Sequence, residues 1–535
     1  MIEIGVSSLA KSFGGDKLFE NVTFDVKTKD KIGLIGRNGT GKTTLMKILA
    51  GCENYQGGLV NKRKGLTIGY LEQIPSYDDE NTVLDVLNEA FSQLDEIRIQ
   101  MEQLEKSFDS LKGDELKAAV SKYSSLHDSY ELAGGYSTKE KLNRIMHGLE
   151  ISEDMQKRQF NKLSGGEKTR IILGKILLEE PEVLLLDEPS NHLDIKSVEW
   201  LEEYLNAYNG TMVMVSHDRY FLDRTVDHIL SINKNNIEVQ KGNFSSWQEN
   251  KDRQDNYEIS QNDKLKKEIN QLETAFRRTA GWSDKVEKSK IGEHSPDRGY
   301  IGHKAAKMMK RAKSIELRKE NSLNEKRKLL KNIEKYDSLK VIPSAYHKDT
   351  LINVDNLSVS YGERTILNNV SFTINQGDRI ALRGKNGSGK STILKILVGK
   401  NENYRGTVNI GSNLNISYVP QDTSFLNGSF SDFIITENIN ESIFRTLLAK
   451  LDMDSYDFSK NLEELSEGQK KKVLIAKSLS QSSHIYIWDE PLNFIDVYSR
   501  IQIEELINEF EPTMIFVEHD RIFNENIATK EVHLT

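Results

Sequence analysis

Short apolar runs and longer helical repeats alternate along this chain of 535 residues. The short runs are continuous, as is typical of strands buried on both faces of a parallel sheet. They cover residues 32–35, 183–186, 380–382 and 485–488. Helix-like runs at residues 44–49 and 392–398 each follow one of these strands after a glycine-rich loop. The pattern predicts an α/β fold.

Residues 87–111 repeat apolar side chains every seven positions. One series holds Leu87, Leu94, Met101 and Phe108, and the second, three positions later, holds Ala90, Ile97, Leu104 and Leu111. Such a seam predicts a helix that packs against a partner helix. Residues 112–114 form a turn, and the return helix carries Leu116, Val120, Tyr123 and Leu126. We therefore expect a projecting helical hairpin over about residues 82–133, although an enlarged helical subdomain fits the same pattern.

A second helical region is expected at about residues 248–348. Its first apolar stripe holds Leu265, Ile269, Leu272 and Phe276, and its second holds Ala305, Met308, Ala312 and Ile315, with Leu323, Leu330 and Ile333 beyond. Two such stripes predict a long antiparallel hairpin. Helix-breaking residues between them predict an irregular tip over about residues 277–306; they are Gly281, Gly292, Pro296, Gly299 and Gly302.

The same motifs occur twice at constant spacing. Lys42 and Lys390 lie 348 residues apart, whereas Ser164 and Ser466 lie 302 apart. Constant offsets indicate two homologous domains, at residues 1–247 and 349–535, with the helical region as a linker between them. The drop of 46 places an insertion between Gln73 and Ser164, where the first helical hairpin is predicted.

The glycine-rich loops, at residues 36–43 and 384–391, have the P-loop pattern in its strand–loop–helix context. Backbone N–H groups of such a loop point at phosphates, and the following helix adds its positive dipole end. Lys42 and Lys390 are expected to reach the β- and γ-phosphates of ATP, and Thr43 and Ser391 to ligate Mg²⁺. The other nucleotide-binding positions are Gly36, Asn38, Gly39, Gly41, Thr44, Gly384, Asn386, Gly387, Gly389 and Thr392.

Paired acids end two of the buried strands. Asp187 and Asp489 are expected to hold Mg²⁺, while Glu188 and Glu490 are expected to act as general bases on the attacking water. An acid pair at a strand end is by itself more often structural. Its position after a P-loop favours catalysis.

Ser-Gly-Gly followed by an acid-ended strand resembles the signature of ABC-type ATPases. The signature residues are Ser164, Gly165, Gly166 and Glu167 in the first domain, and Ser466, Gly468 and Gln469 in the second. The resemblance implies that each ATP lies between one P-loop and the other domain's signature. It further implies that Gln73 and Gln421 sense Mg²⁺ and water, that His217 and His519 position the γ-phosphate, and that Phe13 and Tyr361 stack on adenine.

The second domain departs from this pattern. Glu467 replaces a signature glycine, and Leu492 and Phe494 stand where the first domain has Ser190 and His192. A carboxylate near a γ-phosphate is repulsive unless it points away. The site formed by the first P-loop and the second signature is therefore expected to be the weaker hydrolytic site.

Charge is unevenly distributed. The net charge is −8, but residues 248–348 carry 25 Lys+Arg against 16 Asp+Glu, so this segment is +9 and the remainder is −17. Basic residues interleaved with aromatics at the tip suit folded RNA, although a solvated basic loop would have the same composition. The candidate RNA-binding residues are Arg277, Arg278, Trp282, Lys285, Lys288, Lys290, Arg298, Tyr300, His303, Lys304 and Lys307.

Composition excludes several classes of protein. The single cysteine, Cys52, excludes disulfides within the chain and cysteine-based zinc sites. No apolar run of 18 residues predicts a transmembrane helix, and residues 1–6 lack the features of a secretory signal, so we expect a cytoplasmic protein.

Two ABC domains in one chain, an arm in the first, a basic helical linker and no membrane part together resemble the ABC-F translation ATPases. The resemblance implies a monomer without a transmembrane partner that binds the 50S subunit of the 70S ribosome near the E site. The linker would contact 23S rRNA and P-site tRNA at the peptidyl transferase centre. The long tip resembles the branch that protects ribosomes from lincosamides, pleuromutilins and streptogramin A.

Three alternatives compete with this interpretation. A housekeeping ABC-F translation factor would carry the same motifs, usually with a shorter tip. An ATPase subunit of a transporter has no use for the arm or the basic linker. A DNA-repair ABC ATPase is expected to carry zinc cysteines or a far longer coiled coil.

Overall fold

The computed structural model describes residues 1–13, 16–71, 80–109, 111–191, 193–233, 236–288, 344–361, 364–385, 387–453 and 456–534. Two compact units divide the chain, one made of Met1–Ser245 with Leu339–Thr535 and the other of Ser246–Ser338. The first unit holds both copies of the repeated motifs. None of the helices in the described residues is long and apolar enough to cross a membrane.

The first domain contains two sheets. In the described residues, an antiparallel sheet has the order β2-β1-β4, formed by Asp16–Lys27, Ile2–Phe13 and Gly57–Lys62. The second sheet has the order β5-β6-β7-β3-β8-β9 and is parallel except for its last pair. Its strands are Ile68–Tyr70, Val183–Asp187, Thr211–Val215, Lys31–Gly36, His228–Asn233 and Asn236–Lys241. Helix α1 (Lys42–Ala50) packs in one core with both sheets through Leu45, Val6 and Leu34.

The second domain repeats this plan. Strands β10 (Thr350–Tyr361), β11 (Arg364–Asn375) and β13 (Arg405–Ile410) form the antiparallel sheet. The parallel sheet has the order β14-β15-β16-β12-β17 in the described residues. Its strands are Ile416–Val419, Ile485–Asp489, Met514–Val517, Arg379–Arg383 and Lys530–His533. β1, β2 and β4 begin and end 348 residues before β10, β11 and β13, and β6 begins and ends 302 before β15, so the predicted repeat is confirmed.

Helices complete each domain. In the first, α5 (Thr138–Gly148), α6 (Glu153–Gln156), α7 (Gly165–Glu179), α8 (Ile195–Ala207) and α9 (Arg219–Thr225) surround the sheet. In the second, α12 (Lys390–Leu397) repeats α1. The other helices of this domain are α13 (Phe430–Thr436), α14 (Glu441–Lys450), α15 (Glu467–Ser480), α16 (Val497–Phe510) and α17 (Arg521–Ile527). Phe444, Leu474 and Trp488 pack together in the core of the second domain.

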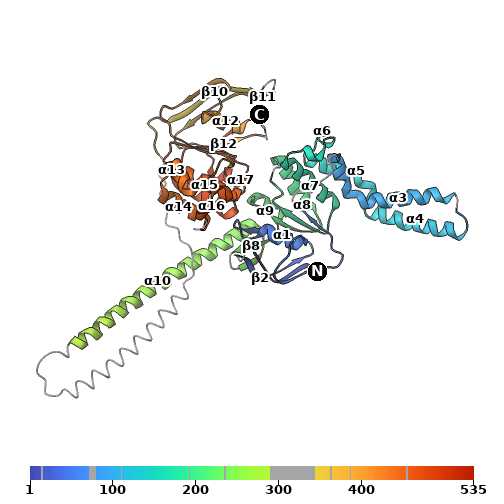
Figure 1. The fold of residues 1–535 in the computed structure, drawn as a ribbon, viewed down its shortest axis with the longest axis horizontal. Helices are drawn as coiled ribbons and strands as arrows, with labels where there is room; N and C mark the ends of the chain where they lie inside the picture. Colours follow the sequence, from blue (N-terminus) through green and yellow to red (C-terminus); the bar gives the residue numbers. More distant parts are fainter. Residues whose placement is uncertain are drawn as a thin grey trace, which may run out of the picture. The chain divides into compact units, whose positions relative to one another are not determined.

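The predicted arm is a helical hairpin. α3 (Ser92–Phe108) and α4 (Asp114–Leu132) lie side by side (Figure 1). The Tyr123 hydroxyl donates to Glu105 over 2.6 Å, and its ring meets Phe108 edge-on. The seven-residue series does not belong to one helix, because α2 (Val83–Asn88) and a 3-10 turn (Glu89–Phe91) precede α3. Thr82 starts α2 with a capping box to Asp85, and Val83, Val86 and Leu87 of this short helix are buried in the domain.

The linker begins with one long helix, α10 (Phe244–Lys288). We expected an irregular tip from residue 277, but the helix continues through Gly281 to Lys288, so the loop does not begin at 277. A single glycine costs a helix only about 1 kcal/mol relative to alanine, and the long helical run on its N-terminal side outweighs that cost. The predicted second stripe, from Ala305 to Ile333, lies outside the described residues.

Candidate nucleotide-binding sites

P-loop 1 (residues 36–43) connects β3 to α1. Gly41 has φ 91°, and a Cβ there would lie 2.5 Å from Leu18 Cδ2, so only glycine fits. The Lys42 ammonium donates to the carbonyls of Gly36, over 2.8 Å, and Arg37, over 3.1 Å. These two hydrogen bonds hold the loop around the Lys42 ammonium.

P-loop 2 (residues 384–391) has the same construction between β12 and α12. The Lys390 ammonium donates to the carbonyls of Gly384, over 2.8 Å, and Lys385, over 3.0 Å. Burial lowers the pKa of both Lys42 and Lys390, which makes an anionic ligand at each ammonium favourable. Asn386 lies outside the described residues.

Each P-loop hydroxyl meets the aspartate of its own domain. Ser391 donates to Asp489 Oδ1 over 3.0 Å, and Thr43 is hydrogen-bonded to Asp187. Burial raises the pKa of both aspartates, so ionising them carries a desolvation cost that a bound cation would offset. A hydroxyl and a carboxylate converging beside the phosphate cradle fit Mg²⁺, which prefers hard oxygen ligands and completes its shell with water and phosphate. Thr43 with Asp187, and Ser391 with Asp489, would hold it.

Both predicted catalytic glutamates have a strained backbone. Glu188 has φ 51° and Glu490 has φ 47°, in the left-handed region that non-glycine residues rarely occupy. The backbone N–H of Glu188 donates to Val215 and that of Glu490 to Val517, so the next strand of each sheet holds this conformation. Strain of this kind is maintained where a side chain must point in one direction.

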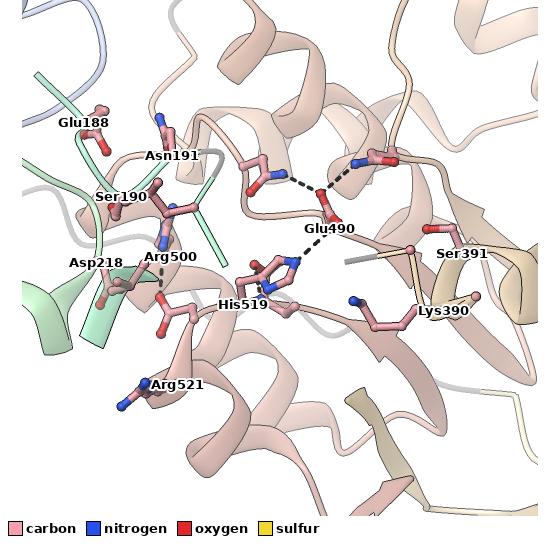
Figure 2. Close-up of a pocket in the computed structure, with 18 of the residues that line it drawn as sticks. Glu188, Ser190, Asn191, Asp218, Lys390, Ser391, Glu490, Arg500, His519 and Arg521 are labelled. Carbon is pink, nitrogen blue, oxygen red and sulfur yellow. Dashed lines mark hydrogen bonds and ion pairs between the residues drawn. The ribbon is translucent and has the colours of Figure 1, made fainter. Parts of the chain in front are cut away.

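The second site gives its glutamate three partners. Gln421 donates to Glu490 Oε2 over 2.7 Å, Asn493 donates to it over 2.8 Å, and His519 Nε2 lies 3.5 Å from Oε1 (Figure 2). Burial opposes ionisation, but the hydrogen bond and charge of His519, with the two amides, lower the pKa of Glu490 below its ordinary value. The Glu490 hydrogen bond in turn raises the pKa of His519.

The first site leaves its glutamate poorly solvated. His217 Nε2 lies 3.4 Å from Glu188 Oε1, and that oxygen is buried without a hydrogen bond among the described residues. Burial, and then the charge of Asp187, raise the pKa of Glu188 to about 8. Burial, with the nearby cations Lys42 and Arg500, lowers the pKa of His217 well below its ordinary value. Gln73, expected beside Glu188, lies outside the described residues.

Both signatures cap a helix. Ser164 accepts from the Glu167 backbone N–H at the start of α7, and Ser466 accepts from that of Gln469 at the start of α15. In return, the Glu167 side chain accepts from the Ser164 backbone N–H, and the Gln469 side chain accepts from that of Ser466. The two signatures therefore form two capping boxes. Uncapped N–H groups at such a helix start are suited to bind phosphate.

One cavity joins P-loop 1 to the second signature. It measures about 750 Å³ and is lined by Arg37, Asn38, Gly39 and Thr40 of the first domain and by Ser466, Gln469 and Lys472 of the second. The Asn38 side chain donates to the Phe494 carbonyl over 2.8 Å, and Arg37 forms an ion pair with Asp452. The head-to-tail arrangement inferred from the resemblance fits this cavity.

The substituted signature residue Glu467 is neutralised within its own domain. Thr423 donates to its carboxylate over 2.5 Å, and Lys470 approaches it at 3.2 Å. These contacts lower the pKa of Glu467 in spite of partial burial. The repulsion that the sequence led us to expect from this carboxylate is therefore reduced by two partners.

A second cavity, of about 510 Å³, contains Lys390, Ser391 and Glu490 together with residues of the first domain. Those residues include Glu188 of the first acid pair, and Ser190 and Asn191 on the loop that follows it (Figure 2). The first signature, residues 164–167, is not among the residues that line it. Of the described residues, the second P-loop thus shares its cavity with a loop of the other domain and not with a signature.

Some predicted residues remain untested by these contacts. Phe13 is 51% exposed, with the Lys11 ammonium 4.6 Å from its ring centroid, and adenine stacking there stays a prediction. Tyr361 ends β10, but its side chain is not described. Of the linker residues, Arg277, Arg278, Trp282, Lys285 and Lys288 lie on α10, where their side chains are not described, and the rest lie outside the described residues.

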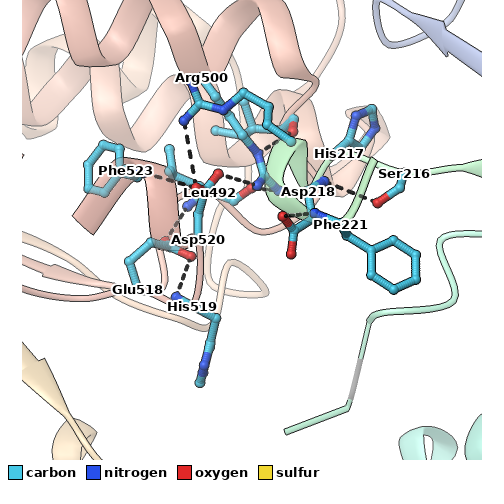
Figure 3. A network of polar contacts seen from close by, with 12 residues as sticks. Ser216, His217, Asp218, Phe221, Leu492, Arg500, Glu518, His519, Asp520 and Phe523 are labelled. Atoms are coloured by element: carbon cyan, nitrogen blue, oxygen red, sulfur yellow. Dashed lines mark hydrogen bonds and ion pairs between the residues drawn. The ribbon is translucent and has the colours of Figure 1, made fainter. Parts of the chain in front are cut away.

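Sequence reasoning missed a buried charge cluster between the two sites. Arg219 forms an ion pair with Glu504. Arg500 donates to Asp520 over 3.0 Å (Figure 3). The signal was present in the repeat, because Arg500 aligns with Val198 at the offset of 302. A buried arginine that replaces an aliphatic residue is a functional candidate.

Comparison with known proteins identifies the family. A profile of the ABC transporter family matches residues 19–191 and 367–493. The putative ATP-binding protein YdiF of Bacillus subtilis (strain 168) is 33% identical over 540 residues, covering 100% of this chain and 80% of YdiF. The energy-dependent translational throttle protein EttA of Haemophilus influenzae is 32% identical over 517 residues, covering 93% of this chain and 86% of EttA.

A solved structure of RNase-L Inhibitor shares the fold, with a TM-score of 0.59 at 19% identity over 98% of this chain and 87% of that structure. Whole-length similarity and the duplicated ATP-binding motifs lead to one assignment. The chain is an ATPase of the ABC family and belongs to its ABC-F-type group of ATP-binding proteins.

Proposed function

We propose that this ATPase acts on the ribosome during translation. The observation that carries the proposal is that two ATP sites in one chain flank a basic segment that begins with the long helix α10. Full-length similarity to a translational throttle protein supports the same role. A segment of charge +9 in a chain whose remainder is −17 suits contact with nucleic acid, because phosphates attract lysine and arginine while the acidic domains are repelled.

At the finer level, we propose binding to the 50S subunit of the 70S ribosome near the E site. The linker then reaches 23S rRNA and P-site tRNA at the peptidyl transferase centre and protects the ribosome from large-subunit antibiotics. The chain acts as a cytoplasmic monomer. ATP and Mg²⁺ bound at both sites favour ribosome binding, and hydrolysis releases the protein.

The test is to trap the ATP-bound state. Replacing both bases, Glu188→Gln with Glu490→Gln, removes the carboxylates while leaving both P-loops intact. The double variant is expected to bind ATP, to lose turnover by about 10²-fold or more, and to sediment with ribosomes in ATP but not in ADP. Lys42→Ala with Lys390→Ala is the matched control, because it removes phosphate binding and abolishes co-sedimentation. Wild-type turnover in the glutamate double variant contradicts the assigned bases, and absence from the ribosome pellet contradicts the ribosomal role.

A housekeeping role in translation is the second candidate. Full-length similarity to EttA, a translational throttle protein, favours it. Susceptibility testing separates the two. Expression of the wild-type chain in a susceptible host is expected to raise resistance to lincosamides, pleuromutilins and streptogramin A. Ribosome binding without any change in drug susceptibility supports the housekeeping role instead.

A further inference from the structure

The loop after the second acid pair (residues 492–496) is held by its backbone. Glu518 accepts from the Leu492 N–H over 3.1 Å, and Arg500 donates to the Leu492 carbonyl over 3.1 Å (Figure 3). Arg500 also donates to the Ile495 carbonyl over 3.0 Å. Two charged side chains therefore hold this loop near both of its ends through hydrogen bonds to its backbone.

The two charged residues are buried. Arg500 is 9% exposed and Glu518 is 8% exposed, and Asp520 is the third member of their cluster. Removing charges from water is unfavourable unless each charge is fully bonded. Burial opposes the charge of Arg500, but Asp520, Glu518 and Glu188 raise its pKa, so it stays a cation.

The first domain does not carry these two charges at the equivalent positions. At the offset of 302, Val198 stands for Arg500 and Ser216 for Glu518. Ser216 accepts from the Asp218 N–H, within its own turn. Both charges are thus specific to the domain whose loop also carries Leu492 and Phe494 in place of Ser190 and His192.

The gripped loop contacts the other domain's phosphate-binding loop. Phe494 has φ 65°, and this left-handed turn presents its carbonyl to Asn38 Nδ2 at 2.8 Å. Asp496 Oδ2 lies 3.5 Å from the Asn38 backbone nitrogen and 3.0 Å from the Lys472 ammonium. A strained carbonyl is presented reliably only if the residues before and after it are fixed.

We propose that Arg500 and Glu518 are positioning residues for ATP hydrolysis at P-loop 1. They hold residues 492–496 in the conformation that meets Asn38, so the site at P-loop 1 depends on a charged clamp that the site at P-loop 2 lacks. The clamp acts on P-loop 1 through this loop. Both of its residues also line the cavity of P-loop 2, where Glu518 accepts from the His519 N–H over 3.0 Å. This inference concerns the ATPase cycle alone and is independent of the proposed ribosomal role.

The test compares turnover at the two sites. In a Glu490→Gln background only the site at P-loop 1 can turn over, and in a Glu188→Gln background only the site at P-loop 2 can. Arg500→Val with Glu518→Ser installs the first domain's own residues and removes one positive and one negative charge together, while Asp520 keeps Arg219 at 3.6 Å. It is expected to lower kcat by about tenfold in the Glu490→Gln background and by less than about threefold in the other. Equal losses in both backgrounds overturn the proposal.

Arg500→Lys distinguishes positioning from charge. Lysine keeps a positive charge beside Asp520 and Glu518. One ammonium cannot replace the planar guanidinium group of Arg500, which donates to Leu492, Ile495 and Asp520 at the same time. A partial loss selective for P-loop 1 is expected. Full activity in Arg500→Lys shows that charge alone matters and overturns the clamp.

Hydrogen exchange tests the loop without catalysis. The Leu492 amide and its neighbours are expected to exchange about fivefold faster or more in the double variant, while β15 and β16 keep their protection. Unchanged exchange in residues 491–497 overturns the proposal. If the double variant does not fold, Arg500→Lys serves in the same experiment.

Discussion

Asn38 and Phe494 connect the two halves of the repeat: the side-chain amide of the first donates to the backbone carbonyl of the second over 2.8 Å. Gly468 lies against the same bond, and a Cβ there would be 2.4 Å from the Phe494 oxygen and 2.7 Å from Asn38 Nδ2. This signature glycine is thus required by a contact between the two domains.

Removing this bond is expected to weaken one site selectively. A hydrogen bond of this kind contributes about 0.5–1.5 kcal/mol, so Asn38→Ala should lower turnover in the Glu490→Gln background by about three- to tenfold. Phosphate release under saturating ATP measures it. Asn386→Ala, at the corresponding position of P-loop 2, is the control and should spare that background. If Asn38→Ala and Asn386→Ala lower turnover equally in this background, the Asn38–Phe494 hydrogen bond has no selective role in catalysis at P-loop 1.

The two sites are expected to hydrolyse ATP at different rates. Glu490 has three partners and a lowered pKa, whereas burial and Asp187 raise the pKa of Glu188 to about 8. A base must be ionised to accept a proton, so at pH 7 only about a tenth of Glu188 is active. Glu490→Gln, which retains the P-loop 1 site, should therefore keep less activity than Glu188→Gln.

The difference in ATPase rate between Glu490→Gln and Glu188→Gln should become smaller from pH 7 to pH 8.5, because Glu188 ionises over that range while Glu490 is already ionised. Initial rates across this range provide the measurement. A gap that is constant with pH, or reversed at pH 7, would contradict the assigned environments.

Acid should destabilise the second domain through Asp496. Burial opposes its charge, but Lys472 and the Ser499 N–H lower its pKa below the ordinary value. Since the folded pKa lies below the unfolded value of about 3.9, this stabilisation is present above pH 4 and is lost as pH falls further. Asp496→Asn leaves Lys472 unpaired and should cost about 3–5 kcal/mol at pH 7. Denaturant midpoints at pH 7 and pH 3.5 should differ less in the variant than in wild type.

Linker substitutions are expected to separate ribosome binding from ATPase activity. Replacing Lys285, Lys288, Lys290 and Arg298 by alanine should weaken ribosome association and flatten its salt dependence, by about one unit of log–log slope for each lost phosphate contact. Basal ATPase activity should be unchanged, because none of these residues lies in a nucleotide motif. Trp282→Ala and Tyr300→Ala should impair drug protection with little effect on the salt slope. Full protection by all these variants would rule out the tip as the protecting element.

The repeat made much of the fold predictable. Strands β3, β6, β12 and β15 were read from apolar runs, because a strand covered on both faces needs no polar alternation. The sequence pattern ends helix α10 too early, because Gly281 reads as a helix breaker although a long helical run precedes it. The arm was predicted, but the start of its heptad pattern lies in a separate short helix, α2. The Thr82 cap that begins this helix does not alter the heptad spacing, so the pattern does not reveal the boundary.

Contacts between the domains could not be predicted in the same way. Arg500 and Glu518 are far from P-loop 1 in sequence, and only the tertiary structure places them behind the loop that meets Asn38. Aligning the two halves would have exposed the paired replacement of Val198 and Ser216. It would not have shown that both new charges bind the backbone of one loop.

The P-loop lysines already have partners. Lys42 and Lys390 each donate to two carbonyls of their own loop, so each cradle holds its shape through an internal bond. Each P-loop is therefore ordered before a nucleotide binds, so binding does not carry the entropic cost of ordering the loop. Binding becomes an exchange of partners, in which a phosphate must outcompete carbonyls that are already bonded. Only a ligand whose phosphate chain reaches the ammonium can make that exchange, so a nucleoside monophosphate should gain little from either cradle.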